Sequence, residues 1–207
     1  MNQKIKYGII GTGLMGREHI SNINLIEEAE IIAISDTSKS SLNETKSLLN
    51  NDIKIYSDYN QIFNINEIDA FIIATPNFTH NEIVKKALNT KKHILVEKPL
   101  CSKLEDCMEL KKISSEYPSI IWVAMEYRYM PPIQKMLEEI NKKEIGKLQM
   151  LSIREHRFPF LKKVDDWNRF QINTGGTLVE KCCHFFDLMR LITKSEAVQV
   201  YASGSQG

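Results

Sequence analysis

The sequence has little of several features that would place it in a specialised class of protein. Its 27 Lys and Arg residues nearly balance its 26 Asp and Glu residues, which leaves a net charge of +1 and no basic run for nucleic acid. No apolar run approaches the length of a membrane span, and residues 1–10 lack the apolar core of a signal peptide. We therefore expect a cytoplasmic protein that binds neither nucleic acid nor a membrane.

Cysteine is also scarce. The four cysteines are Cys101, Cys107, Cys182 and Cys183, and none of them forms a C-x-x-C pair. The adjacent pair can hardly bridge without strain. We expect reduced thiols in a reducing compartment and no metal site, because the sequence shows no cluster of zinc ligands.

Strand-like and helix-like segments alternate as far as residue 125. Strands are expected near 4–10, 30–35, 53–56, 69–74, 92–96 and 120–125, and helices near 14–27, 38–50, 58–64, 78–90 and 103–117. Residues 68–75 are apolar apart from Asp69, which is typical of a parallel strand buried on both faces. The pattern predicts an α/β fold of the Rossmann type, a doubly wound parallel sheet with right-handed crossovers.

The rhythm changes in the rest of the chain. A helix is expected near 131–141, an alternating strand near 147–157, a helix near 178–193 and a strand near 196–203. A two-stranded sheet is marginal by itself. We therefore expect residues 1–125 to form one domain and residues 126–207 to be a partial second domain of a longer, truncated chain.

A glycine motif follows the first expected strand. Gly11-Thr12-Gly13-Leu14-Met15-Gly16 has the form G-x-G-x-x-G, and Asp36 lies twenty residues beyond it at the end of the second strand. In dinucleotide-binding folds the glycines permit a tight turn, a close approach of the pyrophosphate and close helix packing. The helix N-terminus attracts the phosphates, and the acid binds the adenosine ribose. The motif predicts a dinucleotide site.

A second cluster, Glu97-Lys98-Pro99, directly follows the apolar strand 93–96. Strand carboxyl ends line the ligand crevice of an open α/β sheet, so Lys98 is expected near the nicotinamide. A lysine there can stabilise negative charge developing on a substrate oxygen. Its position alone leaves open a solvated surface lysine.

A third cluster begins at Gly175-Gly176 and includes Glu180, His184 and Asp187. On one helix, spacings of four and three residues bring these side chains close together. Histidine is the usual proton acceptor near neutral pH, and Glu180 or Asp187 can orient its ring. A capped surface helix with an incidental histidine is the alternative.

Together these motifs resemble those of the glucose–fructose oxidoreductase / inositol dehydrogenase / rhizopine-catabolism (Gfo/Idh/MocA) family. Four stretches are similar, in the family's order and spacing: Gly11–Gly16, Ala74-Thr75-Pro76-Asn77 with His80, Glu97-Lys98-Pro99, and Gly175-Gly176 through His184 and Asp187. The likeness covers essentially the whole chain.

The resemblance implies a Rossmann domain and a C-terminal α/β domain with an open mixed sheet. It implies hydride transfer between NAD(P) and a secondary alcohol or ketone of a sugar, inositol or related polyol. Lys98 is then expected to contact substrate and nicotinamide, with a Lys–Pro peptide that is often cis, and His184 to act as general acid–base. Residues implied beside the cofactor are Thr75, Pro76, Asn77, His80, Glu97, Lys98 and Arg128.

Two departures from the family pattern matter. Glu180 stands where many members carry aspartate, which puts the substrate class in doubt, and family chains are usually longer. A full-length form is expected to be a homodimer or homotetramer. Asp36 favours NAD because it repels a 2′-phosphate, although Lys39 leaves NADP open. A dinucleotide-binding sensor without turnover is the alternative function, and the 207-residue form can be inactive.

Overall fold

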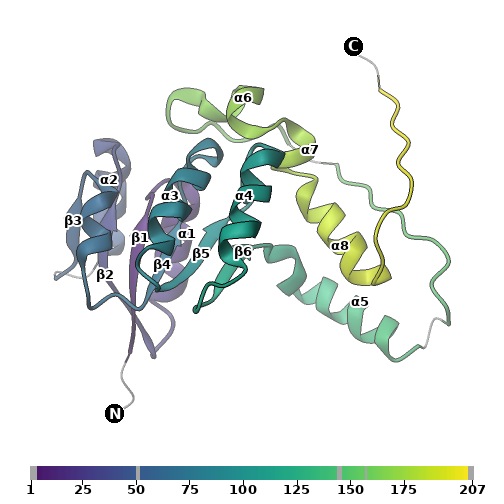
Figure 1. Cartoon of the computed structure of the whole chain (residues 1–207), viewed down its shortest axis with the longest axis horizontal. Helices are drawn as coiled ribbons and strands as arrows, with labels where there is room; N and C mark the ends of the chain where they lie inside the picture. Colours follow the sequence, from purple (N-terminus) through teal and green to yellow (C-terminus); the bar gives the residue numbers. More distant parts are fainter. Residues whose placement is uncertain (1–3, 50–51, 144–145, 157, 205–207) are drawn as a thin grey trace. The chain divides into compact units, whose positions relative to one another are not determined.

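The structure is a computed structural model that describes residues 4–49, 52–143, 146–156 and 158–204 (Figure 1). The chain divides into two compact units. The sheet unit comprises Met1–Ala124 and Pro159–Lys181, and the second unit comprises Met125–Phe158 and Cys182–Gly207.

A six-stranded parallel sheet forms the centre of the sheet unit, with strand order β3-β2-β1-β4-β5-β6. The strands are β1 (Ile5–Ile10), β2 (Ala29–Ser35), β3 (Lys54–Tyr56), β4 (Ala70–Ile73), β5 (His93–Glu97) and β6 (Ile121–Ala124). All six expected strands are confirmed. The order reverses at β1, where the neighbours β2 and β4 lie on opposite sides, and such a switch point is where open α/β sheets bind nucleotides.

Helical segments connect the strands where the sequence predicts them. They are α1 (Leu14–Ile23), α2 (Lys39–Thr45), η1 (Lys46–Leu48), η2 (Tyr59–Asn64), η3 (Asn77–Thr79), α3 (His80–Leu88) and α4 (Leu104–Ser114). Most are shorter than expected, and η1, η2 and η3 are 3₁₀ turns. Residue 50, the expected end of the second helix, lies outside the described residues.

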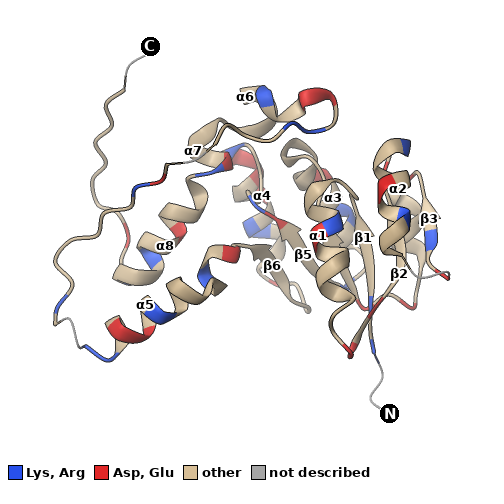
Figure 2. Ribbon diagram, turned by 180° about the vertical axis from the view of Figure 1, so that it is seen from behind, with Lys and Arg blue, Asp and Glu red and all other residues tan. Residues whose placement is uncertain are grey.

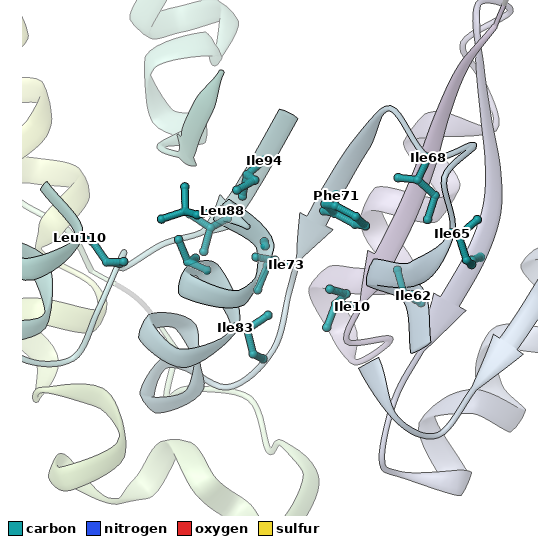
Figure 3. Close-up of a cluster of buried hydrophobic side chains, with 14 of the residues drawn as sticks. Ile10, Ile62, Ile65, Ile68, Phe71, Ile73, Ile83, Leu88, Ile94 and Leu110 are labelled. Carbon is teal, nitrogen blue, oxygen red and sulfur yellow. The ribbon is translucent and has the colours of Figure 1, made fainter. Parts of the chain in front are cut away.

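Buried apolar side chains cover both faces of the sheet. Ile9 and Ile72 pack with α1 residues such as Ile20 in one cluster. Their chain neighbours Ile10 and Ile73 belong to the other, which Figure 3 shows around Phe71. Successive residues of a strand point to opposite faces, so a strand buried on both sides must be apolar throughout.

The segment 159–181 lies at the carboxyl ends of the strands in the sheet unit (Figure 1). It contains η5 (Val164–Arg169), α6 (Gln171–Thr174) and α7 (Thr177–Glu180). Trp167 meets the ring of Phe78 edge-on, with ring centroids 6.4 Å apart. Gly175 has φ +77, and a Cβ there would lie 2.6 Å from the carbonyl oxygen of Ser102, so the backbone approaches the turn after β5 closely.

The second unit contains η4 (Glu126–Tyr129), α5 (Pro131–Asn141) and α8 (Cys183–Thr193). The expected helix 131–141 is confirmed as α5. It carries charges of both signs (Figure 2), and Lys135 pairs with Glu139 at 2.7 Å. All four cysteines of the chain are free thiols. In the described ranges no helix has the length and apolar character needed to cross a membrane.

The two strands expected in the second half are wrong. Residues 147–156 and 196–203 carry no strand, and Met150, Val198 and Val200 are at least 82% exposed. Residue 157 lies outside the described residues. Alternating character identifies a face, but a strand also needs a neighbour for its N–H and C=O groups. In the described part of the chain neither segment has one.

The expected continuous helix 178–193 is also wrong. α7 ends at Glu180 and α8 begins at Cys183, with Lys181 (φ −111, ψ −49) and Cys182 (φ −74, ψ −7) between them. Glu180 and His184 therefore lie on different helices, and their spacing of four residues does not place them on one face.

Candidate dinucleotide and polyol site

Two glycines of the G-x-G-x-x-G motif are required by the protein's own packing. Gly11 has φ +91, and a Cβ there would lie 2.5 Å from the carbonyl oxygen of Ala74. A Cβ on Gly16 would lie 2.0 Å from the carbonyl oxygen of Gly11. The helix α1 therefore starts tightly against the loop that precedes it.

Gly13 differs from these two glycines, because the packing of the protein does not require glycine at this position. Its φ of −65 suits any residue, and a Cβ there would meet nothing within 4 Å. Gly13 is the N-cap of α1, whose first turn carries no acidic side chain. Open space before an uncapped helix N-terminus fits a pyrophosphate, which takes up backbone N–H groups and the positive end of the dipole. The exposed Leu14 and half-buried Met15 are the first two residues of α1.

Replacing Gly13 by Val is expected to weaken NAD binding by at least about 30-fold, or ~2 kcal/mol. The new side chain fills the space open to the pyrophosphate without touching protein atoms. The melting temperature should therefore stay within about 2 °C of wild type. Titration calorimetry and thermal denaturation of the 207-residue chain measure both quantities.

Gly16→Val is the matched control. Its Cβ would collide with the carbonyl oxygen of Gly11, so this variant should lose stability as well as binding. Wild-type affinity in Gly13→Val would show that no ligand approaches the loop there.

Asp36 lies just after β2 and is fixed by the same loop. Its Oδ2 accepts hydrogen bonds from Thr12 N at 2.7 Å and Thr12 Oγ1 at 3.2 Å, and its Oδ1 accepts from Ser38 N at 2.8 Å. A carboxylate has about four lone-pair sites, so acceptor capacity remains for ribose hydroxyls. The carboxylate is thus held beside the glycine loop.

The loop after β4 contains Thr75, Pro76, Asn77 and His80. Asn77 is 5% exposed, and its Nδ2 is buried with no hydrogen-bond partner. An unsatisfied buried donor costs about 1–3 kcal/mol unless a ligand or water pairs with it. Asn77 therefore fits a polar group of a bound cofactor.

His80 has a different environment from Asn77. It is fully buried, with Nδ1 2.9 Å from the Pro99 carbonyl oxygen and Nε2 3.0 Å from that of Thr75. Burial lowers the pKa of His80, and the two carbonyl contacts oppose this shift. Its ring ties the loop after β4 to the turn after β5, while its direct contact with cofactor stays a prediction.

The turn after β5 holds Lys98. The Lys98–Pro99 peptide bond is cis, as the family resemblance implies. Lys98 is half-buried, and its Nζ donates a hydrogen bond to the carbonyl oxygen of Glu180 at 3.1 Å. The ammonium thus reaches the end of α7, within the segment that lies over the strand ends.

No sequence pattern points to Lys163, which reads as one of two adjacent surface lysines. Its Nζ lies 5.3 Å from the centre of the Trp167 ring. Burial lowers the pKa of Lys163, the charge of Lys98 lowers it further, and Glu180 and Glu97 oppose the shift. The half-buried Lys163 therefore belongs to the charged environment of Lys98.

In the second unit His184 is buried on the inner face of α8 with Leu188 and Ile192. Its Nε2 lies 3.4 Å from Glu126 Oε1, and the Tyr127 ring stacks on it at 4.2 Å and an angle of 9°. Neither contact was predicted from the sequence. Glu126 and Tyr127 directly follow β6, and the rule that strand ends carry functional residues could have found them.

Asp187 and Glu180, the residues expected to orient His184, take part in other contacts. Asp187 accepts two hydrogen bonds from Arg128, from Nε at 2.6 Å and from Nη2 at 2.5 Å. Glu180 is 7% exposed, and its carbonyl oxygen binds Lys98. Arg128 links η4 to α8 through this bidentate pair, and its expected place beside the cofactor stays a prediction.

In the sheet unit the glycine loop, Asp36, Asn77 and Lys98 lie in segments that follow the carboxyl ends of strands, and Lys98 binds the carbonyl oxygen of Glu180. The second unit brings together His184, Arg128 and Asp187. The expected meeting of Lys98 with His184 involves both units and stays a prediction. Among the described residues, no group of three or more His, Cys, Asp or Glu side chains could hold a metal ion.

Comparison with known families agrees with this geometry. Residues 5–125 match the model of the oxidoreductase family with an NAD-binding Rossmann fold, and residues 137–206 match that family's C-terminal alpha/beta domain. The chain belongs to the Gfo/Idh/MocA oxidoreductase family. The expected family and the NAD-binding Rossmann fold are therefore confirmed.

Individual Gfo/Idh/MocA relatives are similar over nearly the whole chain. It is 32% identical over 206 residues to the uncharacterized oxidoreductase YrbE of Bacillus subtilis, covering 99% of this chain and 58% of that protein. It is 29% identical over 201 residues to the myo-inositol 2-dehydrogenase of Thermotoga maritima, covering 97% and 58%.

A solved structure agrees with the sequence comparisons. The crystal structure of a probable dehydrogenase from Thermotoga maritima superposes with a TM-score of 0.78 at 27% identity, over 93% of this chain and 56% of that one. The chain thus spans less than two thirds of the length of these relatives.

Proposed function

We propose that this chain carries the cofactor site and the catalytic side chains of an NAD(P)-dependent dehydrogenase. Its substrate is a sugar, inositol or related polyol with a secondary hydroxyl group. The observation that carries the proposal is the open space at Gly13 before α1, on the same sheet edge as the turn that holds Lys98. Family membership and the inositol dehydrogenase relative support it.

We assign residues 1–125 to the cofactor domain and residues 126–207 to part of the substrate domain. We further propose that a full-length form assembles as a homodimer or homotetramer. Four free thiols support a reducing compartment such as the cytoplasm.

In this proposal the residues of the sheet unit bind the dinucleotide and orient the substrate. The N–H groups at the start of α1 hold the pyrophosphate, Asp36 accepts from the ribose hydroxyls, and Asn77 donates its buried amide. Bound NAD supplies the hydride acceptor. The Lys98 ammonium donates a hydrogen bond to the substrate oxygen and stabilises the alkoxide that develops there. The Glu180 carbonyl steadies that ammonium.

His184 moves the proton. Its imidazole accepts the hydroxyl proton during oxidation and returns it during reduction. Glu126 stabilises the imidazolium electrostatically, and Tyr127 fixes the plane of the ring. Asp187 acts through Arg128, since this pair holds η4 against α8 and so keeps Glu126 and Tyr127 on the histidine.

Cofactor reduction tests the proposal. A full-length form is incubated with NAD and a panel of inositols and sugars, and NADH formation is followed. The proposal expects turnover with at least one polyol. Tight NAD binding without turnover on any of them would favour the alternative, a dinucleotide sensor on the same scaffold.

Asp36 makes the cofactor preference testable. Its carboxylate repels a 2′-phosphate, so the 207-residue chain should bind NAD at least about 10-fold more tightly than NADP, or ~1.4 kcal/mol. In Asp36→Asn the ratio should move toward NADP by a similar factor, because repulsion is removed while one acceptor oxygen remains. Fluorescence titration with both reduced cofactors measures the ratio.

The exposed Asp52→Asn variant is the control and should leave the ratio unchanged. A wild-type chain that prefers NADP would overturn the assigned role of Asp36.

A further inference from the structure

Glu97 is a buried carboxylate at the end of β5, directly before Lys98. It is 5% exposed. Its Oε2 accepts a hydrogen bond from the backbone N–H of Lys98 at 3.2 Å, and its Oε1 lies 2.7 Å from Nε2 of His19. A buried carboxylate is costly unless it is paired and hydrogen-bonded, so these two contacts determine where Glu97 lies.

His19 belongs to α1, the helix that begins at the nucleotide loop. Its side chain is 19% exposed. The helix starts close against the loop, since a Cβ on Gly16 would lie 2.0 Å from the carbonyl oxygen of Gly11. The short bond from His19 to Glu97 therefore connects the helix of the nucleotide loop to the Lys98 turn across 78 residues of sequence.

Other contacts hold the same turn from different directions. His80 binds the carbonyl oxygen of Pro99 at 2.9 Å, and the Lys98 ammonium binds that of Glu180 at 3.1 Å. The Glu97 carboxylate differs from these contacts because it accepts a hydrogen bond from the backbone N–H of Lys98. The side chain that pairs with this carboxylate is His19. Loss of His19 would leave a buried charge beside the backbone that carries the lysine.

We propose that His19 is a positioning residue that acts through Glu97 to fix the Lys98 backbone, and hence its ammonium, for reaction with the substrate. The inference rests on the proposed dehydrogenase function. His19 touches neither substrate nor cofactor in this role. Because effective catalysis requires reacting groups within about 1 Å of their proper place, a small shift of the turn is costly.

Two substitutions of His19 by amide residues, Asn and Gln, test the hydrogen bond between His19 and Glu97. In Gln the amide nitrogen reaches as far as Nε2 of histidine, whereas in Asn it falls short. In a full-length form His19→Asn should lower kcat about 10- to 100-fold with the KM for NAD within about twofold, while His19→Gln should stay within about threefold of wild type. Equal kcat in all three proteins, or a loss confined to the KM for NAD, would overturn the proposal.

A second readout needs no turnover. The lysines of the 207-residue chain are reductively methylated with ¹³C-formaldehyde, and Lys98→Arg assigns the Lys98 signal in the NMR spectrum. His19→Asn should shift this signal and His19→Gln should not. Glu97→Gln should also shift it, which preserves the test if His19→Asn fails to fold.

The two readouts separate the two claims. An unchanged Lys98 signal in folded His19→Asn and Glu97→Gln would refute the positioning role even if the enzyme oxidises polyols. A shifted signal in an enzyme that turns over no polyol would keep the link to Lys98 and refute the dehydrogenase.

Discussion

Replacing His184 by Asn is expected to lower kcat of a full-length form by about 10²- to 10⁴-fold, the usual contribution of a positioned general acid–base. Asparagine keeps a polar group on α8 but cannot accept a proton near neutral pH. Binding of NAD should change little, because the residues assigned to the cofactor lie in the sheet unit.

The pH profile distinguishes this role from a structural one. In the wild type the oxidation rate should fall at acid pH as the imidazole becomes protonated, and this limb should disappear in the variant. His156→Asn, a change at an exposed histidine, is the control and should match wild type. Unchanged turnover of His184→Asn across the neutral range would reject its role as base.

Replacing Lys98 by Met should lower kcat by about 10²- to 10³-fold, the usual cost of removing one preorganised donor to a developing oxyanion. Methionine fills a similar volume without a charge. The ammonium is half-buried and already oriented by the Glu180 carbonyl, so little reorganisation is needed when negative charge develops on the substrate.

Steady-state kinetics and NAD titration check this prediction. Lys85→Met removes a surface lysine that pairs with Glu109 and is the control for loss of charge alone. A Lys98→Met enzyme with unchanged kcat and a raised KM for polyol would show that Lys98 only binds substrate.

The first half of the chain could be predicted because burial constrains it on both faces. Ile9 and Ile10 point to opposite sides of β1 into two different clusters, so the strand is apolar throughout and stands out in the sequence. The glycines at positions 11 and 16 could be predicted to be structurally required for a similar reason, since nearby backbone atoms exclude any side chain at either position.

Segments without such constraint were predicted wrongly. The alternation at 147–157 and 196–203 indicates a face but supplies no partner strand. Helix periodicity at 178–193 does not reveal the break between α7 and α8 at Lys181 and Cys182.

The site was predicted in its residue types more than in its contacts. Motifs pointed to Lys98 and His184 individually. The partners that hold them, His19 through Glu97 and Tyr127 on His184, lie far away in the sequence, and no local pattern connects residues 78 positions apart. Such pairs follow from strand order and helix placement, which must be known first.

Transfer of an isotopic label from polyol to cofactor tests whether the enzyme moves a hydride between them. A full-length form is given NAD and a polyol deuterated at the carbon that bears the reacting hydroxyl. The masses of the reduced cofactor and of the oxidised polyol are then measured by mass spectrometry. We expect deuterium on the reduced nicotinamide and a ketone on the polyol. Reduced cofactor without deuterium, or no ketone from any polyol despite bound NAD, would contradict this expectation.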